Sequence, residues 1–130
     1  MRIFIVEDSK DVRERLGYML SEIPEVELVG YAEDELGAIK RIGELLPDVV
    51  TLDLSLHPES GISVLKYIKK YHVATRVIVL TNYTDRFYAD SCKKAGADFF
   101  FDKILQFSRV RPAIWSWVHD SFHTSVALEI

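Results

Sequence analysis

Residues 47–55, PDVVTLDLS, carry the strongest fold signal in this sequence. The apolar, partly β-branched run in this segment is typical of a strand that is buried on both faces in a parallel sheet. The run ends on a carboxylate, Asp53, and Pro58 and Gly61 follow in the next segment. Ligands of open α/β sheets bind at the carboxyl ends of the strands. The segment therefore predicts a parallel sheet with Asp53 at its ligand-binding edge.

The composition indicates one globular domain. The chain has 130 residues, of which 48% are hydrophobic and 28% charged, and its net charge is −4. Its 16 lysines and arginines are scattered, so we expect no direct binding of nucleic acid. The single cysteine, Cys92, excludes an intrachain disulfide and is expected to be a buried, unreactive thiol. No apolar run approaches the roughly 20 residues of a membrane span, so we expect a cytoplasmic protein without membrane contact.

Strand-like and helix-like segments alternate five times along the chain. Helices are expected after each strand, with Ser9, Asp34 and either Thr84 or Asp85 as caps and Gly96 as a terminator. The pattern predicts an α/β fold of the flavodoxin-like, doubly wound type, (βα)5, whose parallel sheet has the strand order 2-1-3-4-5. We assign residues 1–120 to this domain and residues 121–130 to a C-terminal tail that is expected to fray. The predicted strands are Arg2–Val6, Glu27–Tyr31, Val49–Leu52, Arg76–Leu80 and Asp98–Phe101.

Polar residues follow the predicted strands at the edge where ligands would bind. Glu7 and Asp8 follow the first strand, Asp53 ends the third, Thr81 ends the fourth and Lys103 follows the fifth. Three carboxylates packed together repel one another unless a cation lies among them. Oxygen ligands with few protein contacts suit Mg²⁺, which keeps several waters and readily shares a phosphate. The sequence therefore predicts a Mg²⁺ site at this edge.

Four segments together resemble the receiver domain of bacterial two-component response regulators. The segments are IFIVEDS (residues 3–9), VVTLDL (49–54), VIVLT (77–81) and AGADFFFDK (95–103). Each segment alone is a weak signal, whereas all four in this order on the expected strands are specific. The resemblance extends over residues 1–120 and implies a module of a two-component phosphorelay that is not a metabolic enzyme.

The resemblance implies a phosphoryl site centred on Asp53. Asp53 would be the phosphoacceptor, and a sensor histidine kinase or a phosphotransfer protein would be the donor. The implied Mg²⁺ ligands are Glu7, Asp8, Asp53 and the backbone carbonyl of Ser55. Phosphoryl transfer needs in-line positioning and neutralised charge more than covalent chemistry from the protein, which fits this set of residues.

The resemblance also implies the residues that sense the phosphoryl group. Lys103 would form an ion pair with it, and the Thr81 hydroxyl would reach one of its oxygens. Thr81 and Phe100 would act as the switch residues. The face of the fourth helix, fifth strand and fifth helix would then bind a downstream protein or form a homodimer. Trp115 and Trp117 are expected on different faces of the last helix, one in the core and one available to a partner.

The sequence departs from the family pattern at several positions. Asn82 stands where a small residue is usual, and Tyr83 occupies a position that modulates dephosphorylation in the family. Ile104 replaces the usual proline after Lys103. His57 stands where the loop after the phosphoacceptor usually has its proline.

Ordinary explanations exist for each residue taken alone. Asp53 could cap a turn, Glu7 and Asp8 could cap a helix, and Lys103 could be a surface lysine. One alternative function is a receiver-like protein-interaction module that signals without phosphorylation. Another is a flavodoxin-like cofactor binder, which the acidic residues after the first strand disfavour because they would repel a phosphate that lacks a metal ion.

Overall fold

The sheet has the predicted topology. The computed structural model describes residues 1–54 and 58–129. All five strands are parallel, in the order β2-β1-β3-β4-β5, so the predicted fold class is confirmed. The strand limits agree with those predicted to within one residue at either end. The strands are β1 Arg2–Val6, β2 Glu27–Ala32, β3 Val49–Leu52, β4 Arg76–Thr81 and β5 Phe99–Asp102.

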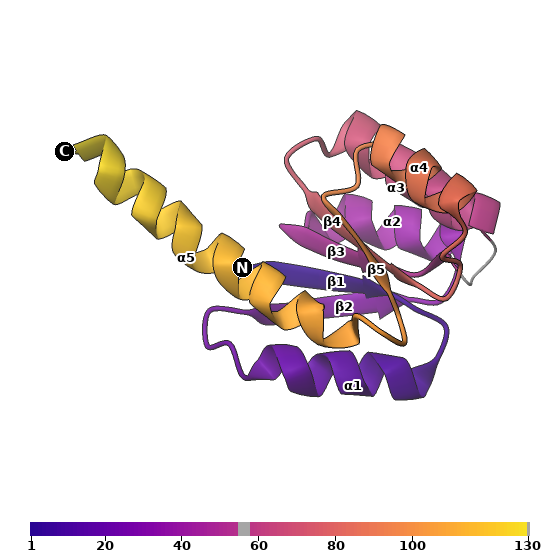
Figure 1. The fold of residues 1–130 in the computed structure, drawn as a ribbon, viewed down its shortest axis with the longest axis horizontal. Helices are drawn as coiled ribbons and strands as arrows, with labels where there is room; N and C mark the ends of the chain where they lie inside the picture. The colour runs from indigo at the N-terminus through magenta and orange to yellow at the C-terminus, as the bar shows by residue number, and fades with distance from the viewer. Residues whose placement is uncertain (55–57, 130) are drawn as a thin grey trace.

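Helices cover both faces of the sheet (Figure 1). The helices α2, α3 and α4 pack on one face, and α1 and α5 pack on the other. Alternate residues of β1, β3, β4 and β5 therefore enter different cores, as Val50 and Val49 of β3 do. The helices are α1 Lys10–Ser21, α2 Glu35–Leu45, α3 Pro58–Tyr71, α4 Arg86–Lys94 and α5 Val110–Glu129, with a short 3₁₀ turn at Phe107–Arg109.

The helix ends follow local capping rules. The Ser9 hydroxyl accepts a hydrogen bond from the Val12 amide at 3.3 Å, and the Asp34 carboxylate accepts one from the Gly37 amide at 2.7 Å. Of the two candidate caps of α4, Asp85 is the one that accepts from the helix, through the Phe87 amide at 2.7 Å. Gly96 follows α4 with a φ of 98°, which a glycine adopts without strain.

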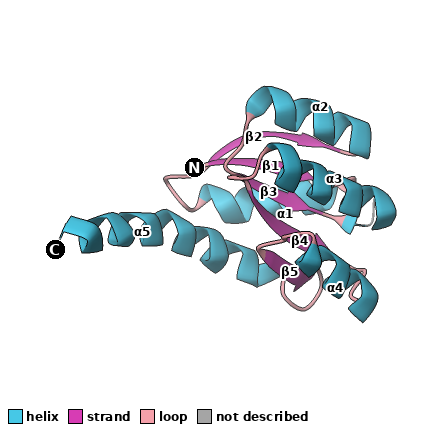
Figure 2. Cartoon of the chain, turned by 90° about the horizontal axis from the view of Figure 1, so that it is seen from above, coloured by secondary structure: helices cyan, strands magenta, loops and turns pink. Residues whose placement is uncertain are grey.

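Helix α5 is longer than the sequence pattern indicated. It runs to Glu129, so residues 121–129, for which weak periodicity predicted a fraying tail, are helical. Its last turns project past the edge of the sheet (Figure 2). Helix propagation adds one hydrogen bond per residue, so a helix that begins on the core can continue beyond it without an apolar stripe. No helix in residues 1–54 and 58–129 is both long enough and apolar enough to cross a membrane.

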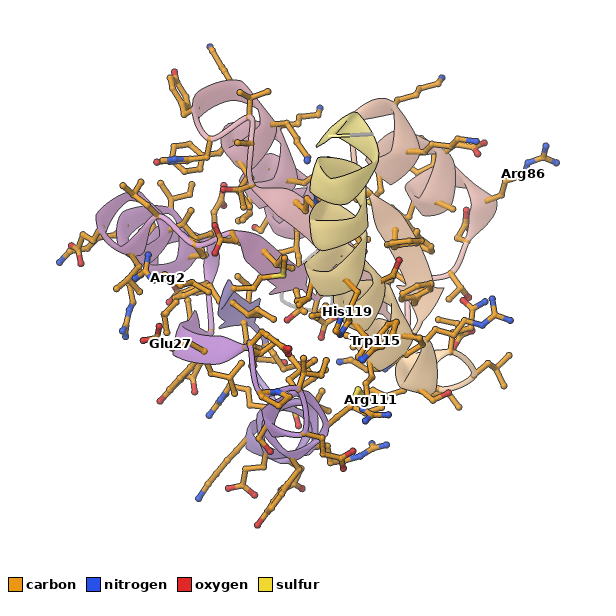
Figure 3. The ribbon with its side chains drawn as sticks, turned by 90° about the vertical axis from the view of Figure 1, so that its left-hand side faces the viewer. Arg2, Glu27, Arg86, Arg111, Trp115 and His119 are labelled. Atoms are coloured by element: carbon orange, nitrogen blue, oxygen red, sulfur yellow. The ribbon has the colours of Figure 1, made fainter. Side chains whose placement is uncertain are left out.

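The two tryptophans of α5 lie in different environments, as predicted. Trp117 packs against the core on the α1 side, with its ring centroid 5.4 Å from that of Phe99. Trp115 is 51% exposed, and its ring centroid is 3.9 Å from that of His119 (Figure 3). Trp115 is therefore the tryptophan that a partner can reach.

Cys92 should resist thiol reagents in the folded protein. Its side chain is fully buried, and burial raises the pKa of the thiol to about 11. At pH 8 only about one thiolate in a thousand is then present, and it is covered. We expect an aromatic disulfide reagent to label Cys92 fully in denaturant and hardly at all without it. Fast labelling of the native protein would contradict this prediction.

Candidate functional site

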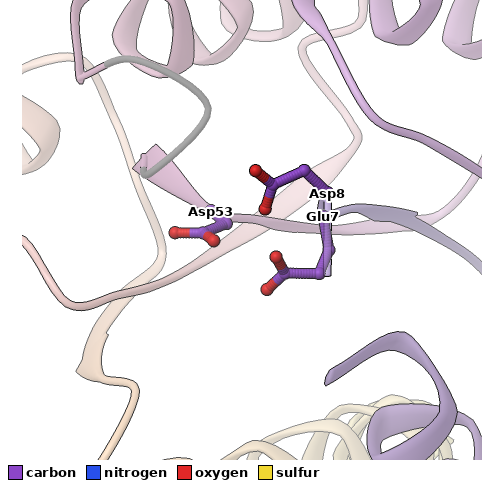
Figure 4. A group of neighbouring side chains, drawn as sticks. All are labelled: Glu7, Asp8 and Asp53. Carbon is purple, nitrogen blue, oxygen red and sulfur yellow. The ribbon is translucent and has the colours of Figure 1, made fainter. Parts of the chain in front are cut away.

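Three carboxylates meet where β1 and β3 end. The two strands are neighbours, with Val6 paired to Leu52, and the Asp53 amide donates to the Val6 carbonyl at 3.0 Å. Glu7 and Asp53 are each 2% exposed, whereas Asp8 is exposed. Figure 4 shows Glu7 and Asp8 extending from the end of β1 toward the side where Asp53 lies, and one carboxylate oxygen of each of the three lies within 4.8 Å of those of the other two. The predicted convergence of Glu7, Asp8 and Asp53 is thus present in the structure.

Lys103 bridges the two buried carboxylates. Its backbone amide donates to the Thr81 carbonyl at 2.9 Å, which fixes the segment after β5 against the end of β4. Its ammonium nitrogen lies 2.6 Å from Asp53 Oδ2 and 2.7 Å from Glu7 Oε1. The Lys103 side chain is only 11% exposed. Charge-assisted hydrogen bonds of this length in a poorly solvated site are strong.

The burial of Glu7 and Lys103 affects the pKa of each group. The pKa of Glu7 is raised to about 7, mainly by burial and further by the nearby charge of Asp53. Hydrogen bonds from Lys103 and from the Ser9 amide lower this pKa but do not outweigh the burial. Burial alone would lower the pKa of Lys103, but its hydrogen bonds to Asp53 and Glu7 outweigh that effect and raise it. Lys103 is therefore a permanent cation at neutral pH. Lys103 contacts two of the three carboxylates, so the cluster has more carboxylates than ammonium groups, which favours a further cation there.

The donor set of the site fits Mg²⁺. All three candidate ligands are carboxylate oxygens, and the exposed side of the cluster, at Asp8, leaves space for the waters that Mg²⁺ retains. Glu7, Asp8 and Asp53 would hold the ion. The fourth predicted ligand, the carbonyl of Ser55, lies outside the described residues, as does His57.

The two predicted switch residues lie on the neighbouring strands β4 and β5. Thr81 is fully buried at the end of β4, and its hydroxyl oxygen accepts a hydrogen bond from the Tyr83 amide at 3.0 Å. Phe100 on β5 is half-buried and packs against the core under α2, α3 and α4. Two residues that depart from the family pattern, Asn82 and Ile104, are both exposed.

Two further residues contribute to the site and carried only weak sequence signals. Arg13 donates from its guanidinium to the Glu7 carbonyl at 2.9 Å. Its signal was helical spacing, since it lies one turn after the Ser9 cap. Gly61 lies against the chain just after Asp53: a Cβ there would be 2.7 Å from Leu54 Cδ2 and 3.0 Å from Leu54 Cα. Glycine spacing after Asp53 indicated this loop but not the close approach.

Adding a methyl group at Gly61 should destabilise the protein. Leu54 is fully buried and cannot retreat, so Gly61→Ala should lower the free energy of unfolding by about 1–3 kcal/mol, as overpacking does. Gly17, in the interior of α1, is the matched control, because its nearest neighbour would be Leu28 Cδ1 at 3.6 Å. Gly17→Ala should raise stability by about 0.5–1 kcal/mol through helix propensity. Urea titration of both variants checks the opposite signs, and two shifts of the same sign would refute the packing argument.

The fold and the site together define a flavodoxin-like α/β protein with an acidic, lysine-bridged cluster of side chains at the switch point of its sheet. Comparison with known proteins identifies the family of this protein. The chain belongs to the response regulator receiver domain family, whose pattern it matches over residues 3–114.

Its relatives include several larger proteins. It is 33% identical over 114 residues to protein-glutamate methylesterase/protein-glutamine glutaminase 1 of Methanospirillum hungatei, which covers 85% of this chain and 33% of that protein. It is 42% identical over 78 residues to the group 3 operon protein of the same description from Rhodopseudomonas palustris, covering 60% of this chain and 22% of the relative. The chain thus spans a third or less of the curated relatives that it matches.

Solved receiver structures have the same fold. The response regulator domain of Thermotoga maritima CheB is 30% identical, with a TM-score of 0.76 over 92% of this chain and 94% of that one. The receiver domain of the putative regulator NarL from Mycobacterium tuberculosis is 26% identical, with a TM-score of 0.79 over 88% of this chain and 93% of that one. The recognition made from the four sequence segments is therefore confirmed.

Proposed function

We propose that Asp53 accepts a phosphoryl group, in a Mg²⁺-dependent reaction, from a phosphohistidine on a sensor histidine kinase or a phosphotransfer protein. The observation that carries this proposal is the contact of Lys103 with Asp53 at 2.6 Å within a cluster of three carboxylates. Such a cluster is costly to bury unless cations complete it. A cation site beside a buried carboxylate is the arrangement that phosphoryl transfer requires.

In the proposed reaction, an Asp53 carboxylate oxygen attacks phosphorus. An O–P bond forms, the P–N bond to the donor imidazole breaks, and its electron pair returns to the ring. Mg²⁺, held by Glu7, Asp8, Asp53 and the carbonyl of Ser55, would neutralise negative charge on the phosphoryl oxygens. The Lys103 ammonium, which contacts the unphosphorylated Asp53 carboxylate, would move to pair with another of these phosphoryl oxygens.

Thr81 is suited to report the new group. Its hydroxyl oxygen already accepts from the Tyr83 amide, so its proton remains available to donate to a phosphoryl oxygen. The phosphoryl group brings nearly two negative charges, which would draw Thr81 and the following loop inward. Phe100 on the neighbouring strand β5 would change its packing in response.

The face formed by α4, β5 and α5 is the proposed output surface. It exposes large apolar side chains, and their exposure does not stabilise the monomer. An exposed apolar patch of this kind is typical of a surface that binds a partner. A downstream protein or a second copy of the chain would cover them in the phosphorylated state. These exposed side chains are Phe87 of α4, Phe99 of β5 and Trp115 of α5, and the loop between β5 and α5 adds the exposed Ile104 and Leu105.

The proposed role is signalling in the cytoplasm, not metabolic catalysis. The methylesterase and glutaminase activities named for the relatives belong to proteins of which this chain matches a third or less. The receiver family supports a protein partner and gives no reason to expect direct contact with nucleic acid or a membrane.

The test of this proposal is the intact mass of the protein after incubation with acetyl phosphate and Mg²⁺. A gain of one phosphoryl group that requires Mg²⁺ would support it. The alternative, a receiver-like module that signals without phosphorylation, predicts no gain. In that case a partner captured equally well with and without acetyl phosphate would favour the alternative.

A further inference from the structure

We propose that Arg13 is a positioning residue for Mg²⁺ binding, because it fixes the backbone that carries the acidic pair Glu7 and Asp8. This inference rests on the proposed function, in which these two residues hold the ion. Arg13 itself would touch neither the metal ion nor the phosphoryl group. It would act through the Glu7 carbonyl, whose orientation sets the direction in which the next residue, Asp8, leaves the strand.

The Arg13 guanidinium is held by three different elements. One of its nitrogens donates to the Glu7 carbonyl at the end of β1 at 2.9 Å, and the same nitrogen lies 3.2 Å from a carboxylate oxygen of Glu33, in the loop after β2. The guanidinium carbon lies 4.2 Å from the ring centroid of Tyr31 on β2. The Arg13 side chain is only 14% exposed. A group with this many contacts is locked, and it can hold the carbonyl in one position.

Two further hydrogen bonds link the acidic segment to the start of α1, while the Glu7 amide donates to the Ala32 carbonyl at the end of β2 at 2.9 Å. The Ser9 amide donates to Glu7 Oε2 at 3.1 Å, and the Arg13 amide donates to the Ser9 carbonyl at 3.0 Å. Glu7 is therefore fixed at its carboxylate by Ser9 and Lys103 and at its carbonyl by Arg13. Asp8 is exposed, so its position depends on this backbone. Residues that orient metal ligands in this way commonly change affinity about 10- to 100-fold when removed.

The charge of Arg13 acts in the opposite direction to its hydrogen bond. A guanidinium close to the site repels Mg²⁺, so removal of the charge alone would strengthen Mg²⁺ binding. Loss of the hydrogen bond to the Glu7 carbonyl would loosen the ligands and weaken binding. The sign of the change in affinity therefore distinguishes a positioning role from a purely electrostatic one.

The experiment is calorimetric titration of the unphosphorylated protein with Mg²⁺ for the wild type, Arg13→Ala, Arg13→Lys and Arg15→Ala. We expect Arg13→Ala to weaken Mg²⁺ binding about 10-fold and Arg13→Lys, which keeps a donor but loses the planar guanidinium over Tyr31, to be intermediate. Arg15 is the matched control, since it lies on the same helix, is exposed, and stacks on Phe107 at 4.3 Å. Arg15→Ala should leave the Mg²⁺ affinity unchanged.

Two further measurements separate positioning from general damage. In the metal-free Arg13→Ala variant, amide hydrogen exchange should speed up at Asp8 and Ser9 but not in β3 or β4. At saturating Mg²⁺, its rate of phosphorylation by acetyl phosphate should return to the wild-type rate. A loss of rate that Mg²⁺ does not restore would overturn the proposal.

The outcomes also separate this inference from the proposed function. Equal or tighter Mg²⁺ binding by Arg13→Ala, with the wild type binding normally, would overturn the positioning role alone. A wild-type protein that binds no Mg²⁺ would overturn both. If Arg13→Ala does not fold, Arg13→Lys decides the question, because unchanged affinity and unchanged exchange in that variant would refute a role for the guanidinium.

Discussion

We expect the Asp53→Asn variant to gain no phosphoryl group from acetyl phosphate and Mg²⁺ under conditions in which the wild type gains one. A neutral amide is a poor nucleophile and forms no stable acyl phosphate, so the loss should be complete. The variant should still fold, because asparagine has nearly the shape of aspartate and Lys103 keeps its 2.7 Å contact with Glu7.

Asp48→Asn is the matched control for this experiment. Asp48 lies just before β3, while Asp53 lies just after it, so the two carboxylates occupy opposite ends of one strand. Asp48 accepts a hydrogen bond from the Arg2 amide at 2.7 Å, which an asparagine side chain can also accept. Asp48→Asn should be phosphorylated like the wild type. Phosphorylation that persists in Asp53→Asn would show that another residue is the acceptor.

The second large effect is expected from Lys103→Met. The substitution keeps much of the side-chain volume but leaves Glu7 and Asp53, each 2% exposed, without their shared cation. Removal of one partner from a buried ion pair commonly costs about 3–5 kcal/mol, and we expect a loss of that order in the free energy of unfolding without Mg²⁺. The variant should also be a poor phosphoacceptor, since the phosphoryl group would lose its ammonium partner.

Mg²⁺ should restore part of the stability of Lys103→Met. A ligand that binds only the folded state stabilises it by about 2.7 kcal/mol at a concentration 100 times its dissociation constant. Urea titrations with and without Mg²⁺ measure this recovery. Lys94→Met, at an exposed position at the end of α4, should change stability little in either condition. A loss below about 1 kcal/mol in metal-free Lys103→Met would mean that the carboxylates do not need the lysine.

Local sequence patterns predicted much of this structure. Apolar runs of the right length predicted each strand, and the Ser9 and Asp34 caps marked the starts of two helices where they are found. Strict alternation of strands and helices then indicated a doubly wound parallel sheet, because parallel crossovers are right-handed and helices must cover both faces, and 2-1-3-4-5 is one of the common strand orders of such a sheet. The same logic placed Glu7, Asp53, Thr81 and Lys103 at one edge of the sheet.

Residues on the edge strand β5 show where such rules are insufficient. Three consecutive phenylalanines occupy this strand, yet Phe99 is exposed, Phe100 is half-buried and only Phe101 is buried. An edge strand has a neighbour on one side only, so its burial depends on how far the flanking helices extend over it. The length of α5 similarly exceeds what its apolar spacing indicated.

The amino-acid sequence was thus sufficient for the elements, their order and the set of polar groups at the strand ends, since these follow from periodicity and from the polarity of parallel strands. The partners of those groups could not be read from it. That Lys103 bridges Glu7 and Asp53, that Arg13 holds the Glu7 carbonyl, and that Gly61 lies against Leu54 all depend on distances between segments far apart in the chain. Those distances are set by the packing of whole helices on the sheet, which no local pattern encodes.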